Sequence, residues 1–536
     1  MAILGIGLTS QVIAAETPRQ WYRDGTKSVL KSELLIKNRL TAKNVILFVG
    51  DGMGISTVTA ARILEGQMKG GYGEENILSF EKLPYVALSK TYNTNQQTPD
   101  SAGTMTAMMT GVKTKAGVIG IDQKAIRGDC ASIFGNELKT FLEEYEEMGR
   151  STGVVTTARL THATPAATYA HVPERNWEDD DDLPEDAAGC KDIARQLIEF
   201  GYGDGLEVAM GGGRRHFLPV EMDDPEDAGA TGNRTDGRDL TAEWLSGYPN
   251  AEFVYDQAGF DAIDPSATDH LLGLFERSHM EYEYDRAGDT AGEPSLSEMT
   301  DKAIDILSKN EDGFFLMVES GRIDHAHHAG NAYRSLTDTI EFANAVKVAM
   351  EKTSHKDTLI LVTADHSHVF TIAGYPTRGN PILGKVMGND SSGAPTGTFS
   401  SDALGLPYTT LSYANGPGYT GASSEQGEGP KTYPHFGSGY TGITSGRPDL
   451  TAVDTTDPSY MQEATVPLSS ETHAGEDVAI YAGGAGSYLM RGVVEQNVIY
   501  HVMRHAARLK LNEVIDLVQE IDLEPYADLL EDIESP

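Results

Sequence analysis

Apolar residues follow two alternating spacings along the chain, and these spacings predict strands and helices in turn. Four short apolar runs predict buried strands over 44–52, 151–165, 314–324 and 358–368. Apolar residues at helical spacing predict helices over 56–67, 136–149 and 335–352. Strands that alternate with helices form βα units. We therefore expect an α/β fold with a doubly wound, mostly parallel central sheet and helices on both faces.

The apolar pattern is interrupted between residues 373 and 470. That stretch is rich in Gly, Ser, Thr, Tyr and Pro and shows no helical periodicity, which predicts a loop-rich insertion or a small β-domain. The strand pattern resumes over 471–484, and an amphipathic helix is predicted over 493–509. We therefore expect a core in two parts, 16–372 and 471–536, with the insertion between them.

Metal-binding types of side chain stand at or just beyond the end of each predicted strand. They are Asp51, His162, Thr164, Glu319, Asp365 and His366. In open parallel sheets, sites form outside the carboxyl ends of the strands, so these side chains are expected to share one crevice. One acid at a strand end is usually a turn or a helix cap, but four such ends together indicate a site.

The stretch "ESGRIDHAHHAG", residues 319–330, concentrates ligand-type side chains. Asp324 and His328 are spaced i, i+4, so one helical turn would aim both the same way. Carboxylate and imidazole are the usual zinc ligands in proteins. A polar cap at the end of a strand is the alternative, and this stretch alone does not separate the two.

Ser101 lies in "TPDSAGTMTAMMTG", where Pro and Asp precede a run of small and helix-forming residues. It is therefore predicted at a helix N-terminus, where the helix dipole favours negative charge. A serine there is usually only a cap. No Gly-x-Ser-x-Gly motif surrounds Ser101, so activation by a histidine is not indicated. A bound metal ion could activate the hydroxyl instead.

The chain is strongly acidic, with 80 Asp and Glu against 42 Lys and Arg and a formal net charge of −38. This charge argues against nucleic acid and against an anionic membrane surface as partners. An anionic substrate would need local positive charge from metal ions or a few arginines. The acids are spread along the chain, which suits a solvated surface and is consistent with a halophilic habitat.

The N-terminal residues 1–15 are apolar, carry no charge before Glu16 and end in small residues, as secretory signals do. The segment lacks the usual basic start, which is consistent with truncation, and a buried first helix is the alternative. With no other long apolar run and no apolar C-terminal tail, we expect a periplasmic or secreted protein without a membrane anchor. The two cysteines, Cys130 and Cys190, permit one disulfide.

Six motifs together resemble those of the alkaline phosphatases. They are "VGDGMG", "TPDSAG", "THATPAATYAHVPERNW", "ESGRIDHAHHAGN", "TADHSHVF" and "ETHAGEDV". The amino-acid sequences of these motifs are closer to those of the animal enzymes than to those of the enteric bacterial form. The resemblance extends, with gaps, from about residue 20 to 510. The resemblance implies a homodimeric hydrolase of phosphate monoesters with broad specificity. It also implies that the insertion is a crown domain and that Cys130 pairs with Cys190.

The resemblance further implies two Zn²⁺ ions and one Mg²⁺ ion. One zinc site would comprise Asp324, His328 and His473, the other Asp51, Asp365 and His366, and the magnesium site Asp51, Thr164 and Glu319. Ser101 would be the nucleophile that forms a phosphoserine. Arg175 would grip two phosphate oxygens as a planar fork, and Asp100 would orient it.

Two histidines depart from the enteric bacterial pattern. His162 and His325 stand where that form has Asp and Lys, whereas the animal members have His at both positions. We therefore expect His162 at the edge of the magnesium site rather than as a tight ligand, because Mg²⁺ prefers oxygen ligands. His325 and His368 are expected beside the metals or the substrate.

A possible Ca²⁺ site is also implied by the resemblance. It would involve Glu226, Phe275, Glu276 and Glu293. In so acidic a chain, solvated surface acids are an equally good interpretation of the glutamates.

Two other classes of function compete with a phosphomonoesterase. A phosphodiesterase of the same superfamily usually lacks the magnesium ligand set, and a sulfatase needs a Cys-x-Pro-x-Arg-like motif that neither cysteine offers. A secreted protein that only binds metals would have no use for Ser101 and Arg175.

The charge of the chain generates a first prediction. Repulsion between spread acids opposes folding and dimer formation, and salt screens it as the Debye length falls from ~10 Å at 0.1 M to ~3 Å at 1 M. Molar NaCl should therefore raise the midpoint of thermal unfolding and favour the dimer, while chelators still inactivate the enzyme. Melting curves from about 0.1 to 3 M NaCl at saturating metal test this. A flat or falling midpoint would contradict it.

Overall fold

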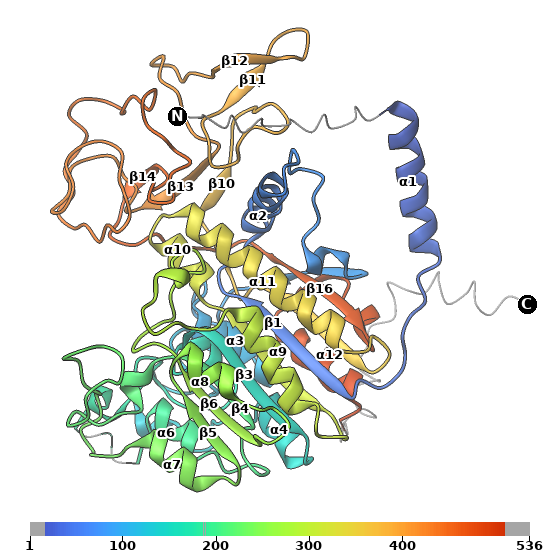
Figure 1. Ribbon diagram of the computed structural model, residues 1–536, viewed down its shortest axis with the longest axis vertical. Helices are drawn as coiled ribbons and strands as arrows, with labels where there is room; N and C mark the ends of the chain where they lie inside the picture. The colour runs from blue at the N-terminus through green and yellow to red at the C-terminus, as the bar shows by residue number, and fades with distance from the viewer. Residues whose placement is uncertain (1–16, 186, 188, 510–536) are drawn as a thin grey trace, which may run out of the picture.

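The computed structural model describes residues 17–185, 187 and 189–509, so the predicted signal segment and residues 510–536 lie outside it. A ten-stranded sheet forms its centre (Figure 1). In spatial order the strands are β17 (Gly492–Glu495), β2 (Tyr85–Lys90), β16 (Val478–Gly484), β8 (Thr358–Thr363), β1 (Asn44–Gly50), β7 (Phe314–Ser320), β3 (Ser151–Arg159), β4 (Val208–Gly212), β6 (His270–Leu274) and β5 (Ala251–Val254). Strand β16 is antiparallel to both neighbours, and the other pairings of this sheet are parallel.

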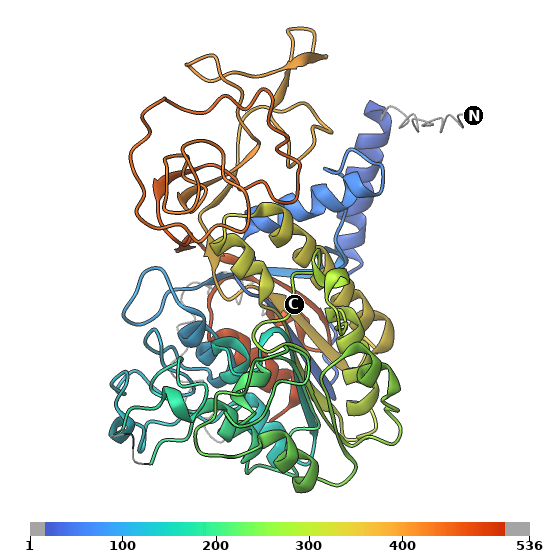
Figure 2. The same ribbon diagram turned by 60° about the vertical axis from the view of Figure 1, so that its left-hand side comes forward.

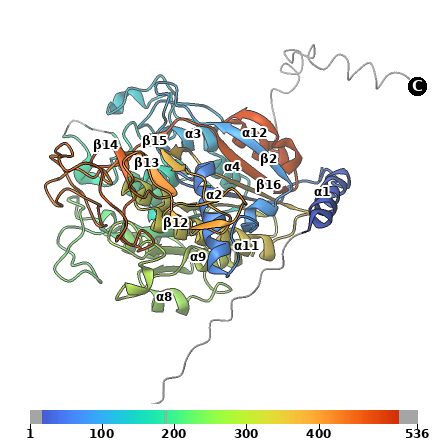
Figure 3. The same ribbon diagram turned by 90° about the horizontal axis from the view of Figure 1, so that it is seen from above.

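Side chains of the central strand point alternately into two hydrophobic cores. Val45 and Leu47 belong to one core, Ile46 and Phe48 to the other. The first core is covered by α3 (Ser101–Thr110), α4 (Phe141–Glu147) and α12 (Val498–Ala507), the second by α2 (Ile55–Met68), α9 (Leu296–Leu307) and α11 (Ala332–Lys352). Figure 3 shows the two helical layers on opposite sides of the sheet. The predicted doubly wound α/β fold is confirmed.

Most predicted elements are shorter in the structure, and some change type within the predicted range. The predicted strand over 151–165 stops at Arg159, and the short helix α5 (Ala163–Ala166) follows it. The predicted helix over 493–509 begins only at Val498, because Gly492–Glu495 pairs with β2 as an edge strand. Backbone pairing at the sheet edge therefore overrides the helical apolar spacing of these residues.

The loop-rich segment forms small sheets outside the core. A three-stranded sheet contains β10 (Phe370–Ile372), β13 (Leu411–Gly416) and β14 (Ala464–Pro467), and a hairpin contains β11 (Met387–Asn389) and β12 (Pro395–Phe399). This part stands at one end of the molecule (Figures 1 and 2). Its assignment as a separate domain over 373–470 stays a prediction.

Five further helices and two short strands complete the described elements that bear on the site and its surroundings. They are α6 (Ile193–Ile198), α7 (Leu240–Gly247), α8 (Gln257–Ala262), α10 (Arg322–His328), α1 (Pro18–Glu33), β9 (Ser367–His368) and β15 (His473–Ala474). Helix α1 stands away from the body and has no buried residue (Figure 1). Among the described residues, no helix combines the length and apolarity that crossing a membrane requires.

A disulfide joins Cys130 and Cys190, whose Cα atoms are 5.7 Å apart. This confirms the predicted pairing. The bridge closes a loop of 60 residues that contains Arg175 and the turn around His162. Closing a loop of this length stabilises the fold by about 3 to 4 kcal/mol in the chain-entropy model.

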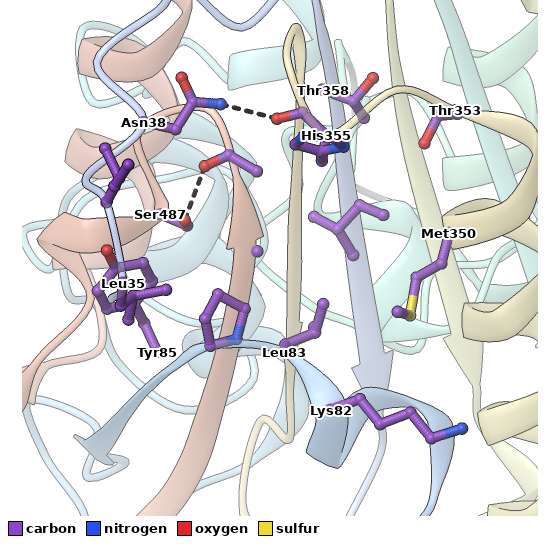
Figure 4. A pocket seen from close by; sticks show the side chains of 15 residues that line it. Leu35, Asn38, Lys82, Leu83, Tyr85, Met350, Thr353, His355, Thr358 and Ser487 are labelled. Carbon is purple, nitrogen blue, oxygen red and sulfur yellow. Dashed lines mark hydrogen bonds between the residues drawn. The ribbon is translucent and has the colours of Figure 1, made fainter. Parts of the chain in front are cut away.

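An apolar groove of about 330 Å³ lies far from the carboxyl ends of the strands. Leu35, Leu83, Tyr85 and Met350 line it beside Thr358, the first residue of β8 (Figure 4). Within it, Asn38 Nδ2 donates to the carbonyl of His355 at 2.7 Å. The groove therefore belongs to the opposite end of the sheet from the residues described next.

Candidate active site

The carboxyl ends of β1, β7 and β8 bring three predicted site residues together. The register places Val49 opposite both Glu319 of β7 and Thr363 of β8. Asp51 and Asp365 each follow two residues later, so they leave neighbouring strands at the same level. This is the crevice that a parallel sheet offers for ligands.

Four carboxylates are buried around this crevice. They belong to Asp51, Glu319, Asp324 and Asp365, which are 0, 0, 4 and 0% exposed. Burial, together with the charges of its neighbours, raises the pKa of Asp51, and burial raises that of Glu319 to about 8. So many buried negative charges repel one another and are stable only with bound cations or protons.

A first possible metal group joins Asp324, His328 and His473. Carbonyl oxygens only accept hydrogen bonds, so His328 Nδ1 donates to Glu471 at 2.5 Å and His473 Nδ1 donates to Pro99 at 2.8 Å. Each neutral ring therefore has its lone pair on Nε2. The two Nε2 atoms are 3.1 Å apart and lie 3.3 and 3.4 Å from Asp324 Oδ1. Two lone pairs and a carboxylate that converge in this way fit a cation.

A second group surrounds His366, and Ser101 faces it. His366 Nε2 lies 3.2 Å from Asp51 Oδ1 and 3.3 Å from Asp365 Oδ2. The hydroxyl oxygen of Ser101 is 3.2 Å from the same nitrogen. The three residues Asp51, Asp365 and His366 offer ligand atoms close enough to share one metal ion.

A third group lies on the other side of Asp51. Thr164 Oγ1 is 3.5 Å from Asp51 Oδ2, and Thr156 donates to Glu319 Oε2. Within the described part of the chain, Glu319 Oε1 is buried without a hydrogen-bond partner, as is Asp51 Oδ1 on the side of the second group. His162 could join Asp51 and Glu319 as a ligand. Unpaired buried oxygens of this kind fit a hard, oxygen-preferring cation.

Ser101 is the first residue of α3, as predicted. Asp100 caps the helix by accepting from the backbone N–H of Gly103 at 3.1 Å. Its other oxygen accepts from Gly117 at 2.7 Å and lies 3.3 Å from Nη1 of Arg175. Arg175 is therefore held beside the helix N-terminus that carries Ser101, with 19% of its side chain exposed.

His368 and Glu471 form a support behind the first group. His368 Nε2 is 2.7 Å from Asp324 Oδ1, and Nδ1 is 2.5 Å from Glu471 Oε2. Although burial opposes it, the two carboxylates raise the pKa of His368 to about 10. His368 was predicted near the metals, but Glu471 was missed, although it opens the motif "ETHAGEDV". His325 lies at the far edge, with its ring centre 5.5 Å from that of His162.

Comparisons with known proteins identify the family of this chain. The family model described as alkaline phosphatase matches residues 42–509. The chain belongs to the alkaline phosphatase family. It is 44% identical to the tissue-nonspecific isozyme of Gallus gallus over 93% of this chain and 91% of that one, and 43% identical to alkaline phosphatase of Gadus morhua over 92% and 97%.

Solved alkaline phosphatases share the fold at lower identity. The Thermus thermophilus structure matches with a TM-score of 0.60 at 24% identity, over 93% of this chain and 96% of that one. The structure from the Antarctic bacterium TAB5 matches with a TM-score of 0.56 at 22% identity, over 88% and 100%. The identity to the animal proteins is higher than that to these bacterial structures, which is consistent with the resemblance of the six motifs to the animal enzymes.

This alkaline phosphatase has a separate acidic cavity of about 500 Å³. Glu226, Glu276 and Asp289 line it, and burial raises the pKa of Glu226 to about 7 and that of Glu276 to about 8. Asp289 was missed in the sequence. Glu293 lies beside them: its carboxylate accepts from the backbone N–H of Glu281 at 3.0 Å, and burial together with the charges of Glu276 and Asp289 raises its pKa to about 9. The ring of Phe275 is buried in a hydrophobic core, so only its carbonyl could serve as a ligand.

The buried carboxylates predict how the metal-free enzyme responds to pH. Since folding raises the pKa of Glu319 from about 4.5 to about 8, the protonated form stabilises the fold at low pH. That stability is lost as pH rises through this window. The melting temperature of chelated protein should therefore fall from pH 5 to pH 8, and restored metal should remove most of the fall. Glu319→Gln should flatten the metal-free profile; an unchanged slope in this variant would contradict the assignment.

Proposed function

We propose that this protein is a secreted or periplasmic alkaline phosphatase that hydrolyses phosphate monoesters through a phosphoserine at Ser101. The observation that carries the proposal is the position of the Ser101 hydroxyl. It lies at the N-terminus of α3, 3.2 Å from His366 and beside the carboxylates grouped with that histidine. Family membership over residues 42–509 supports the same activity.

Two Zn²⁺ ions and one Mg²⁺ ion are the cations we assign to the three groups. Asp324, His328 and His473 would hold one zinc, and Asp51, Asp365 and His366 the other, since nitrogen and carboxylate ligands suit zinc. Asp51, Thr164 and Glu319 would hold magnesium through oxygen, with His162 at its edge. When bound, the zinc ions lower the pKa of coordinated hydroxyl groups and stabilise negative charge on the reacting oxygens.

Within this site the protein's own residues position the reaction. The N-terminus of α3 stabilises negative charge on the Ser101 oxygen as it attacks phosphorus. Arg175 would hold two non-bridging oxygens of the phosphate, with Asp100 keeping its guanidinium in plane. The bond to the leaving oxygen breaks as the serine ester forms, and water then hydrolyses the phosphoserine. Because these contacts concern only the phosphoryl group, many leaving groups should be accepted.

A phosphodiesterase of the same superfamily is the second candidate. Its substrate carries two ester oxygens, so it has fewer free oxygens for a clamp and needs space on both sides of phosphorus. The oxygen-rich third group beside Asp51 favours the monoesterase. Comparing rates on a chromogenic monoester and a diester, with and without chelator, distinguishes these two enzymes and a protein that only binds metals.

A homodimer is also proposed. Helix α1 has no buried residue, and Trp21, Tyr22 and Leu30 are exposed on it. A helix of this length is marginal in water unless an apolar face packs against something. The mass in solution, measured by light scattering, tests the dimer. A halophilic source is proposed from the charge of −38.

Replacing the nucleophile should separate chemistry from metal binding. Ser101→Ala should reduce turnover by about three orders of magnitude or more, because the attacking oxygen is lost. Zinc and magnesium content should stay near that of the wild type. Trapping with labelled substrate and peptide mapping should find phosphate on the Ser101 peptide of the wild type only. Phosphate on another residue would refute the assignment.

Removing the clamp should act mainly on binding. Arg175→Ala should weaken inhibition by inorganic phosphate roughly 10- to 100-fold, because charge-assisted hydrogen bonds are lost. Turnover should persist at high substrate concentration. Inhibition constants measured alongside metal content check this, and an unchanged constant would exclude the clamp.

The acidic cavity is proposed to bind Ca²⁺ through Glu226, Glu276, Asp289 and Glu293. Burial and neighbouring acids raise the pKa of the three glutamates, so a divalent cation would relieve the repulsion in this cluster. Added Ca²⁺ should raise the melting temperature of chelated, zinc- and magnesium-reconstituted enzyme. Asp289→Asn and Glu293→Gln should each weaken this response, because both carboxylates lie beside Glu276. An unchanged response in either variant would remove that residue from the ligand set.

A further inference from the structure

A loop after β6 carries His279 toward the candidate active site, although no sequence motif singled it out. The loop is pinned on both sides of this residue. The backbone N–H of Gly213 donates to the carbonyl of Ser278 at 2.6 Å, and that of Met280 donates to Thr157 at 3.1 Å. A Cβ at Gly212 would lie 2.1 Å from the Ser278 carbonyl oxygen, so this close approach requires glycine.

Three imidazole rings meet where this loop reaches the site. The ring centre of His279 is 4.0 Å from that of His325 and 5.4 Å from that of His162. The His162 and His325 centres are 5.5 Å apart. His279 therefore contacts both histidines that depart from the enteric bacterial pattern, and it comes from a different part of the chain.

The ring of His279 is itself held by Arg159, the last residue of β3. Nη1 of Arg159 lies 2.5 Å from His279 Nε2, and its backbone nitrogen lies 3.2 Å from Nδ1. A neutral imidazole accepts one hydrogen bond, and the charged guanidinium is the stronger donor. Two further bonds at 2.6 and 2.7 Å tie Arg159 to Glu178. His279 is thus fixed to the sheet rather than to a free loop.

His162, which packs against His279, in turn restrains Arg175. Nη2 of Arg175 is 3.2 Å from His162 Nε2, and a guanidinium can only donate, so the histidine accepts. Asp100 binds Nη1 of Arg175 at 3.3 Å. The guanidinium plane therefore depends on two partners, and one of them, His162, is packed against His279.

We propose that His279 is a positioning residue for the phosphate clamp. By packing on His325 and on the edge of His162, it keeps His162 in the orientation that receives the hydrogen bond of Arg175. It need not touch the substrate. The inference rests on the proposed role of Arg175 and goes beyond it, because it assigns phosphate affinity to a side chain on the β6 loop.

The test compares phosphate binding in variants at position 279. His279→Ala should weaken binding of inorganic phosphate about 3- to 10-fold, the range expected for losing aromatic packing. KM for a monoester should rise by a similar factor, with a smaller change in kcat. His279→Phe keeps a packed ring and should retain most of the affinity, whereas His279→Asn should not. His355→Ala, a histidine at the far end of the sheet, is the matched control and should bind phosphate normally.

A double-mutant cycle decides whether the effect passes through Arg175. In the Arg175→Ala background, His279→Ala should have little further effect on phosphate affinity. An equal loss in both backgrounds, or no loss in His279→Ala with normal metal content and melting temperature, would overturn the proposal. Normal phosphate affinity in Arg175→Ala alone would refute the clamp, and the positioning role with it. A loss in Arg175→Ala without one in His279→Ala would refute only the latter.

Discussion

Repulsion among buried carboxylates is the constraint on which the rest of the site depends. Asp51, Glu319, Asp324 and Asp365 all lie within the protein around the end of the central strand. Charges of one sign in a low-dielectric interior are stable only beside cations. The neighbouring histidines are arranged accordingly. Carbonyl oxygens of Pro99 and Glu471 engage the Nδ1 atoms of two of them, so lone pairs rather than protons face the carboxylates.

The parallel sheet and its loops supply the rigidity that this arrangement needs. Strand β1 is flanked by β7 and β8, so their carboxyl ends deliver acids from three distant segments to one level. Contacts from neighbouring side chains then restrain the side chains that form the site. His368 and Glu471 fix Asp324, and Asp100 with His162 flanks Arg175. The proposed metal ligands and the proposed clamp are therefore held by neighbours that need not touch the substrate.

Positive charge is concentrated where the surface is otherwise acidic. The chain has nearly twice as many acids as bases, yet Arg159, Arg175 and Arg322 gather around the histidines beside the site. Metal ions would add further positive charge there. An anionic substrate can then be held at the site, although the protein as a whole repels anions. The charges that bind the substrate and the charges that solvate the surface therefore lie in different parts of the protein.

The sequence by itself determined the local features of this protein. Apolar spacing predicted the strands β1, β3, β7, β8 and β16 and the helices α2, α4, α11 and α12. Asp324 and His328 could be placed on one helical face because i, i+4 geometry is local. Tertiary structure decided which distant segments meet. Asp289 joins Glu226 and Glu276 at the acidic cavity, because all acids look alike in so acidic a chain and only the loop path selects among them. Likewise, residues 492–495 became an edge strand through pairing with β2, and His279 reached His162 through the β6 loop. The spacing of apolar residues indicates the secondary structure of one segment, whereas contacts between segments depend on strand order and packing.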